Sequence, residues 1–227
     1  MSAMPDKYQV HQTEVQIAAG DVRLDGLLVV EPASLGLVLM LERSAATLAT
    51  DRSALIAAAL RQAGLSTLQV GMLSHDEERH APDSWHQVTM LTTRLEAVVA
   101  WVSRQPGLRS QPLAVLAREA TAAAAVRVAA HRESPFIAIA CRGGRPDLAG
   151  MEPLRALKTP LLMVAGEYDA ALPPNRQVEQ FLAGGCELIV VAGASHTFEE
   201  AGALDEASRH FVTWFLRWLA VGSRSPE

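Results

Sequence analysis

The sequence has few cysteines, few aromatic residues and no excess of positive charge. Its 227 residues include two cysteines, aromatic residues make up 5%, and the formal net charge is −5. Since no cluster of lysine and arginine stands out, we expect no surface for nucleic acid or for anionic membranes. In a reducing compartment, Cys141 and Cys186 are expected to be two buried free thiols.

Long apolar runs are also absent. No stretch reaches the roughly 18 uninterrupted apolar residues of a membrane-spanning helix. The first ten residues, MSAMPDKYQV, contain no apolar segment of the kind that a secretion signal carries. We therefore expect a cytoplasmic protein, folded as a single domain over residues 1–227 around a core drawn from its 49% of hydrophobic residues.

Short apolar runs alternate with helix-length segments along the whole chain. A hairpin around Gly20-Asp21 is expected to form an antiparallel edge. Further strands are predicted at residues 35–41, 65–72, 113–117, 135–141, 160–165 and 187–191. Helices are predicted at residues 50–64, 85–105, 120–130, 174–185 and 205–221, the last with an aromatic core stripe at Phe211, Trp214, Phe215 and Trp218. This alternation favours an α/β fold: a doubly wound, mainly parallel sheet with helices on both faces.

In such sheets, ligands bind beyond the carboxyl ends of the strands. The residues that directly follow the predicted strands are therefore the candidates for chemistry. They are Glu42-Arg43, His75, Glu119, Arg142, residues 167–169 and Ser195-His196.

The segment at residues 112–130, PLAVLAREATAAAAVRVAA, passes from strand to helix with almost no loop. In α/β-hydrolases this junction is the nucleophile elbow, G-x-S-x-G, whose serine sits on a strained turn. The corresponding residues here are Ala117-Arg118-Glu119-Ala120-Thr121. Glutamate stands in the place of the serine, and neither glycine of the elbow is present.

Two later strand ends supply an acid and a histidine in the α/β-hydrolase order of elbow, acid, histidine. They are the G-x-x-D turn that ends at Asp169 and the G-A-S-H segment that ends at His196. With the segment RGGRPDLAG at residues 142–150, they make the chain resemble the small, lidless, dienelactone-hydrolase-like group of α/β-hydrolases. The resemblance implies that Asp169 orients and stabilises the imidazole of His196, whose other nitrogen faces residue 119.

The chain departs from this group at the oxyanion site as well as at the nucleophile. Members of the group usually have a His-Gly-Ser or Gly-Gly segment after the third strand, where this chain has Glu42-Arg43-Ser44. Losing one oxyanion donor typically costs about 2.7–4 kcal/mol of transition-state stabilisation, so we expect ordinary ester cleavage to be slow. An elbow also needs a positive φ, so Glu119 either retains that strain and projects toward His196, or the turn relaxes.

The first functional hypothesis is an enzyme that acts on a small organic substrate. Glu119 would be its nucleophile or general base, His196 would shuttle a proton, and Asp169 would orient His196. A carboxylate nucleophile has a precedent in the aspartate of the epoxide-hydrolase and dehalogenase branches of the superfamily. The residues expected to bind the substrate are Glu42, Arg43, Ala120 and His75, with Arg43 on an anionic or carbonyl group.

The second hypothesis is a non-catalytic protein of hydrolase fold that serves as a ligand-binding or assembly module. In it, Glu119 would pair with Arg43 or Arg118 and fill the former pocket. An open pocket with Glu119 against the imidazole favours the enzyme, whereas a filled pocket with Glu119 bound to an arginine favours the module.

Other motifs give weaker indications. The polar segment 74–86 is expected to be a loop over the site, and the spacing of His75, His80 and His86 does not fit a metal site. No G-x-G-x-x-G follows the first central strand, so no cofactor is expected. Arg142 and Arg145 are expected to meet Asp147 or Glu152, and the exposed face of the last helix leaves room for a homodimer.

Overall fold

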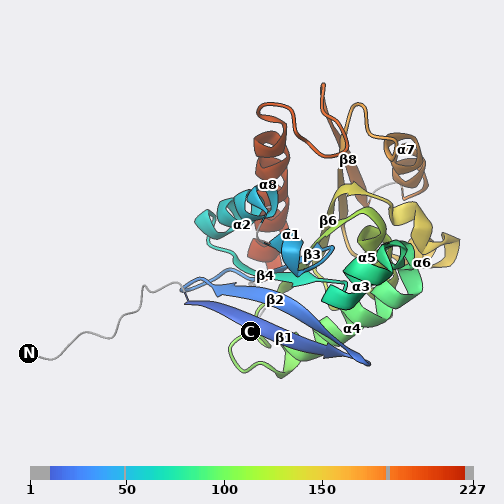
Figure 1. The fold of residues 1–227 in the computed structure, drawn as a ribbon. Helices are drawn as coiled ribbons and strands as arrows, with labels where there is room; N and C mark the ends of the chain where they lie inside the picture. The colour runs from blue at the N-terminus through green and yellow to red at the C-terminus, as the bar shows by residue number, and fades with distance from the viewer. Residues whose placement is uncertain (1–10, 49, 183–184, 223–227) are drawn as a thin grey trace, which may run out of the picture.

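A single eight-stranded sheet forms the centre of the computed structural model, which describes residues 11–48, 50–182 and 185–222 (Figure 1). The order across the sheet is β1-β2-β4-β3-β5-β6-β7-β8. The strands are β1 (His11–Ala19), β2 (Val22–Val30), β3 (Leu37–Glu42), β4 (Ser66–Gly71), β5 (Leu113–Arg118), β6 (Ala138–Gly144), β7 (Leu161–Gly166) and β8 (Cys186–Val191).

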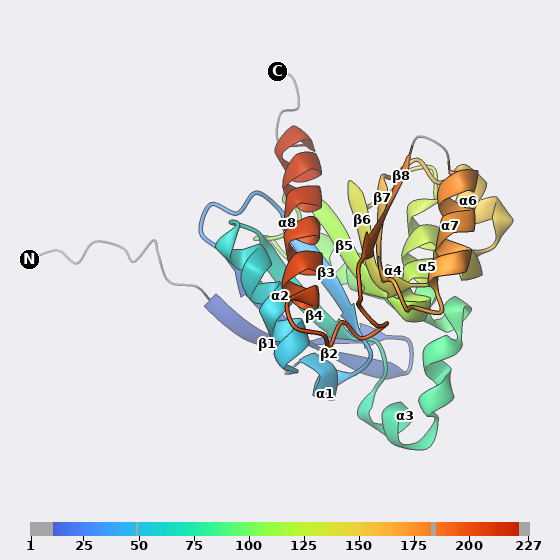
Figure 2. The ribbon, with the colours of Figure 1, turned by 90° about the horizontal axis from the view of Figure 1, so that it is seen from above.

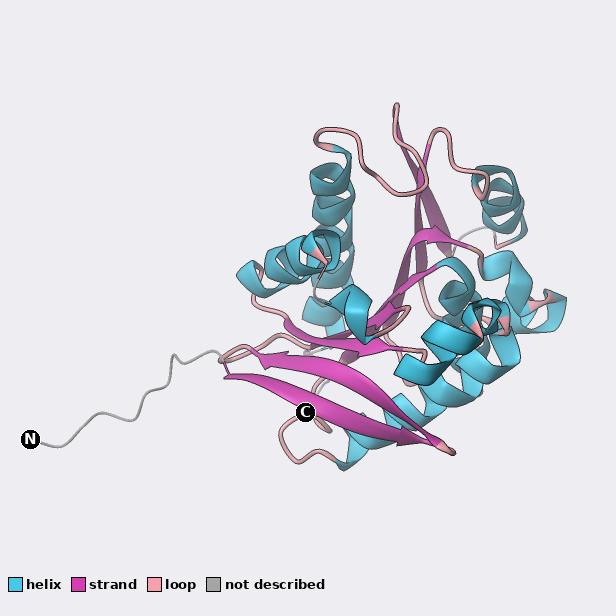
Figure 3. Ribbon diagram, viewed as in Figure 1, coloured by secondary structure: helices cyan, strands magenta, loops and turns pink. Residues whose placement is uncertain are grey.

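Helices follow most of the strands and lie on both sides of the sheet (Figure 3). The α-helices are α1 (Ala45–Leu48), α2 (Asp51–Gln62), α3 (His75–His80), α4 (Val88–Arg104), α5 (Glu119–Ala129), α6 (Met151–Ala156), α7 (Leu172–Phe181) and α8 (Ala203–Gly222). Two short 3-10 helices, η1 (Pro82–His86) and η2 (Pro146–Ala149), precede α4 and α6.

The sheet is mainly parallel with a hairpin at one edge, as the sequence predicts. β1 and β2 form an antiparallel hairpin, and β2 joins β4 antiparallel. From β4 across the sheet to β8 every neighbouring pair is parallel. The expected doubly wound α/β architecture with an N-terminal hairpin edge is thus confirmed, and the carboxyl ends of the parallel strands meet at one edge.

Each face of the sheet has its own hydrophobic core, because side chains of a strand alternate between the two faces. One core lies between the sheet and helices α4 and α5, and the other between the sheet and helices α2 and α8 (Figure 2). In α8, Phe211 and Phe215 are fully buried and Trp214 is 3% exposed, which confirms three members of the aromatic core stripe; Trp218 is half-buried and packs against this core. The alanine-rich α5 is almost wholly buried, as expected of a helix whose small side chains allow close packing on β5 and β6.

The prediction of a loop after β4 was wrong. Residues 75–80 form α3, which begins with a capping box: the hydroxyl of Ser74 accepts from the amide of Glu77, whose carboxylate accepts from the amide of Ser74. Arg94 also donates to Glu77 at 2.5 Å. This short helix leads into η1, which carries the buried Trp85.

Two smaller expectations also changed. β6 runs to Gly144, three residues beyond its predicted end: its ladders with β5 and β7 continue to Arg142, and Gly144 forms an isolated parallel bridge with Glu119. Cys141 is buried, but Cys186 is only half-buried; both are free thiols. Among the described residues, no helix is long and apolar enough to cross a membrane.

Candidate functional site

The elbow between β5 and α5 keeps a strained backbone. Glu119, its central residue, has a φ of 46°, in the left-handed region that a bulky side chain rarely occupies. The amide of Arg145 donates to the carbonyl of Glu119 at 2.9 Å, which ties the turn to the end of β6. Of the two alternatives from the sequence, the strain is therefore retained.

Thr121, where the elbow motif has its second glycine, holds this turn from within. Its hydroxyl accepts from the amide of Arg118 at 2.9 Å and donates to the carbonyl of Arg118 at 2.6 Å. The side chain is fully buried. A side-chain hydroxyl therefore satisfies the polar groups that the sharp turn leaves without a helical partner.

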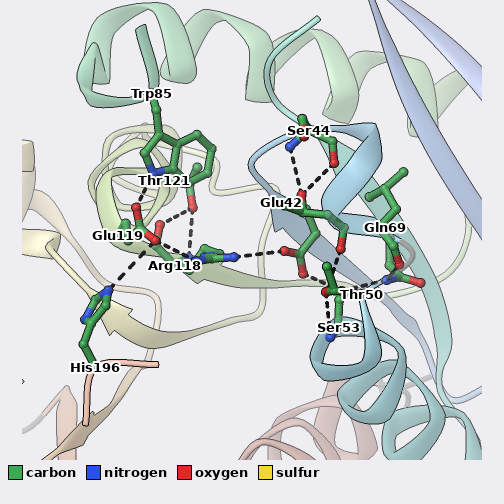
Figure 4. A network of polar contacts seen from close by, with 12 residues as sticks. Glu42, Ser44, Thr50, Ser53, Gln69, Trp85, Arg118, Glu119, Thr121 and His196 are labelled. Carbon is green, nitrogen blue, oxygen red and sulfur yellow. Dashed lines mark hydrogen bonds and ion pairs between the residues drawn. The ribbon is translucent and has the colours of Figure 1, made fainter. Parts of the chain in front are cut away.

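The carboxylate of Glu119 lies where three side chains converge (Figure 4). Arg118 donates to its Oε1 at 2.7 Å, and the indole of Trp85 donates to its Oε2. The imidazole Nε2 of His196 lies 3.9 Å from the same Oε1, which is an ion-pair distance and not a hydrogen bond. Glu119 is therefore both bound to an arginine and placed against the histidine.

His196 reaches this point from the loop after β8, held by Asp169 from the loop after β7. Its Nδ1 lies 3.0 Å from Oδ1 of Asp169, which also accepts from the amide of Ala171 at 2.8 Å. The Asp169 side chain is 1% exposed, whereas that of His196 is 42% exposed. The geometry matches the orienting acid and histidine that the family order implies.

The surroundings shift the pKa of each member of the group. The hydrogen bond to Asp169, with the nearby Glu119, raises the pKa of His196 to about 9 despite partial burial. Burial by itself would raise the pKa of Glu119, but the neighbouring His196, Arg118 and Trp85 together lower it to about 2. At neutral pH the site therefore holds an imidazolium between two carboxylates.

Arg118 also binds a second carboxylate, that of Glu42 at the end of β3. Its Nη1 lies 3.5 Å from Oε2 of Glu42, and the hydroxyl of Ser53 donates to the other oxygen at 2.6 Å. Glu42 is 5% exposed, and Gln69 extends the network by donating to Ser53 at 2.8 Å (Figure 4). Glu42 thus lies behind Arg118 in a polar network that is buried against α2.

A cavity of about 430 Å³ opens beside Arg118 and His196. Its lining is Thr47, Thr50, Arg52, Arg118, Arg142, His196 and Thr197. The sequence put Arg118, Arg142 and His196 near strand ends, but it gave no sign that Thr47, Arg52 and Thr197 would join them, because these lie in helical or loop segments beyond the strands. The pocket beside the elbow is therefore open, and several of its lining side chains are cationic.

The fold of this chain is similar to those of two solved hydrolase structures. A crystal structure of dienelactone hydrolase from Anabaena variabilis is 30% identical, covers 93% of this chain and 99% of its own, and superposes with a TM-score of 0.84. The chain belongs to the dienelactone-hydrolase-like family of α/β-hydrolases. The lidless α/β serine hydrolase XC6422 from Xanthomonas campestris, 16% identical over 96% of this chain and 99% of its own with a TM-score of 0.70, shares the fold.

The curated relatives add a different name. A Mycobacterium tuberculosis protein, called a "Putative phosphoribosyl transferase", is 34% identical over 206 residues, which are 91% of this chain. Those residues are 46% of that protein, so the chain spans about half the length of the curated relatives it matches. No family model matches the chain.

The other residues expected to bind substrate in this dienelactone-hydrolase-like chain lie outside the cavity lining. The guanidinium of Arg43 donates to the carbonyl of Pro82 at 3.2 Å and so contacts the start of η1. His75 is exposed at the start of α3, and Ala120 is buried in the first turn of α5.

The partners predicted for Arg142, in β6, and Arg145, directly after it, are confirmed for Arg145 alone. Arg145 forms a bidentate pair with Asp147, at 2.8 and 2.7 Å. Arg142, instead of meeting Asp147 or Glu152, points to the cavity. Within the described residues, no group of three His, Cys, Asp or Glu side chains is placed to hold a metal ion.

Proposed function

We propose that this protein is an enzyme in which Glu119 is a carboxylate nucleophile toward carbon, assisted by His196 and oriented by Asp169. One geometric relationship carries the proposal: Oε1 of Glu119 lies 3.9 Å from the imidazole Nε2, whose Nδ1 lies 3.0 Å from Asp169. The nucleophile, the proton carrier and its orienting acid thus lie in one row beside an open cavity.

The first step uses the charges that are already present. Oε1 of Glu119 attacks an electrophilic carbon of a small organic substrate, and the bond from that carbon to its leaving group breaks. The leaving group takes the bonding electron pair, and the imidazolium of His196 gives it a proton. The products are a Glu119 ester, a neutral imidazole and the protonated leaving group.

The second step returns the enzyme to its starting state. Once Glu119 is esterified, one of the two carboxylates that raise the His196 pKa is neutral, so the imidazole becomes a base suited to water. His196 takes a proton from water as the water oxygen adds to the ester carbonyl carbon. Collapse of this adduct breaks the bond to the alkoxide, which takes the proton back from His196. The Glu119 acid then protonates His196.

A covalent trapping experiment tests this proposal. We expect styrene oxide or an alkyl bromide to leave a mass increase on the peptide that contains Glu119, and His196→Asn to accumulate that ester because its hydrolysis is blocked. Glu119→Gln is the matched control and should show no adduct. A single turnover in H₂¹⁸O should place the heavy oxygen in the Glu119 carboxylate; label in the alcohol alone would contradict a carboxylate nucleophile.

A second candidate function has its own observation. The 2.7 Å ion pair between Arg118 and Glu119, with the indole of Trp85 on the other oxygen, is the arrangement expected of a non-catalytic ligand-binding module. Such hydrogen bonds stabilise the carboxylate and lower its nucleophilicity. Ligand binding in the cavity, without an adduct on Glu119 from any electrophile, would favour this candidate.

A further inference from the structure

The cavity beside the elbow is lined by cationic groups that come from different elements. Arg118 ends β5, Arg142 lies in β6, Arg52 in the first turn of α2, and His196 in the loop after β8. None of the described residues that line the cavity carries a carboxylate. A ligand in it therefore meets positive charge from several directions.

The sheet itself brings two of these arginines together. Arg118 and Arg142 are register partners in the parallel pair of β5 and β6. Paired residues of neighbouring strands direct their side chains to the same face, so both leave the sheet on the side that α2 covers. Two like charges on neighbouring strands repel each other unless an anion lies near both.

Three of the four cations already have an anionic partner. Arg118 is bound to Glu119 and Glu42, Arg52 is paired with Glu199 at 2.6 Å, and His196 with Asp169.

Arg142 differs from the other three. Its Nη1 is buried and has no hydrogen-bond partner within the part of the chain that the structure describes. Burial and the neighbouring Arg118 lower the pKa of this guanidinium to about 10. A buried guanidinium nitrogen without an acceptor is costly, and a bound anion would remove that cost.

We propose that this cavity binds the phosphoryl group of a small organic phosphate, with Arg142 as its main anchor and Arg118 and Arg52 beside it. A tetrahedral phosphoryl group presents three acceptor oxygens to donors that arrive from different directions, whereas a planar carboxylate fits the edge of one guanidinium. The volume of about 430 Å³ leaves room for an organic group. The inference rests on the proposed function only for what happens to the ligand after binding.

The hydroxyls in the lining have a smaller part. The hydroxyls of Thr47, in α1, and Thr50, before α2, donate to nearby backbone carbonyls, those of Ser44 and Thr47, at 2.6 and 3.0 Å. Arg118, by contrast, is held by Glu119, so an incoming phosphoryl group competes with that carboxylate. Removing the charge of residue 119 should therefore strengthen phosphate binding.

Calorimetric titration at pH 7.5 and low salt tests the proposal with three probes: inorganic phosphate, phenyl phosphate and benzoate. We expect phenyl phosphate to bind more tightly than inorganic phosphate, because its ring fills the cavity, and benzoate to bind at least about tenfold more weakly than phenyl phosphate. Added salt should weaken phosphate binding. Equal or tighter binding of benzoate would overturn the assignment to a phosphoryl group.

Arginine variants locate the site. Arg142→Gln should weaken phenyl phosphate binding by about tenfold or more, the effect of one hydrogen bond to a charged group. Arg52→Gln, an exposed side chain whose loss cannot disturb the core, should weaken it by about threefold. Arg217→Gln, on the exposed face of α8, is the matched control and should leave it unchanged. Unchanged affinity in both Arg142→Gln and Arg52→Gln would overturn the proposal.

Glu119→Gln separates this inference from the proposed function. It should abolish the covalent adduct but bind phenyl phosphate at least as tightly as the unsubstituted protein does. Arginine-dependent phosphate binding without any adduct would leave the anion site in place and remove the nucleophile. An adduct without phosphate binding would do the reverse.

Discussion

The imidazole of His196 lies between two carboxylates, 3.0 Å from Asp169 on one side and 3.9 Å from Glu119 on the other. Both carboxylates favour the imidazolium, and the hydrogen bond with Asp169 contributes most to a pKa of about 9. In a serine hydrolase the same ring must be neutral to accept the proton of the serine. This charge state therefore sets the chemistry open to the site.

The first prediction concerns the pH dependence of His196. The pKa of His196 in the folded protein lies above the ordinary 6.5. The protonated imidazole therefore contributes its full amount to the free energy of unfolding below pH 6.5, and this contribution is lost as the pH rises through about 9. Glu119→Gln removes one carboxylate and should lower the pKa of His196, and Asp169→Asn should lower it further. NMR titration of the His196 ring proton measures both. A pKa that is unchanged in Glu119→Gln would show that the two groups do not interact.

The second prediction concerns the close approach of Gly143 to the site. A Cβ added at Gly143 would lie 2.8 Å from Cε1 and 2.9 Å from Nδ1 of His196, so Gly143→Ala should displace the imidazole from Asp169. Gly20→Ala is the matched control: φ is also positive, at 63° against 53°, but the added Cβ meets nothing within 4 Å. Both variants should lose about 1 kcal/mol to backbone strain. Only Gly143→Ala should also shift the His196 NMR signals; equal spectra would contradict the contact.

The third prediction concerns the hydroxyl inside the elbow. Thr121→Val leaves the amide of Arg118 without its partner and should lower the free energy of unfolding by about 1–3 kcal/mol, measured by urea denaturation. Thr121→Ser keeps the hydroxyl and loses one methyl group, so about 1 kcal/mol is expected. If serine proved as harmful as valine, packing rather than hydrogen bonding would hold the turn.

The fourth prediction concerns Trp85 and Glu119. The indole donates to Oε2 of the carboxylate, and a hydrogen bond to a charged group typically stabilises by about 1.5–3 kcal/mol. A double-mutant cycle with Trp85→Phe and Glu119→Ala should therefore give a coupling energy of about 1.5 kcal/mol or more in urea denaturation. If the losses in the free energy of unfolding were additive, the indole of Trp85 would stabilise the fold by packing alone.

Much of this fold can be predicted from local patterns in the sequence. The solid apolar runs mark the buried strands, and the junction at residues 117–121 marks the elbow even with Glu119 at its centre, because a buried strand runs directly into a helix-forming run. The Ser74-x-x-Glu77 capping box is also present in the sequence, and it is a signal for the start of α3. Its many charged residues led to the prediction of a loop instead.

The partners of individual side chains are harder to predict from the sequence. Arg142 and Arg145 are near neighbours in the chain, yet Arg142 lines the cavity and Arg145 binds Asp147. The difference depends on the β5–β6 ladder continuing to Arg142, because that pairing places Arg142 in register with Arg118. The contact of Arg43 with Pro82 is also set by the tertiary fold, because η1 lies beside Arg43 only in the folded chain.

The backbone of the elbow is held by groups other than the side chain at its apex. The Thr121 hydroxyl and the amide of Arg145 fix the turn around residue 119, and neither contacts the Glu119 carboxylate. We therefore expect this position to accept other side chains without a change in the surrounding backbone. A set of variants with serine, cysteine, aspartate or glutamine at position 119 would compare these groups on the same backbone. The elbow is therefore a suitable starting point for enzyme design.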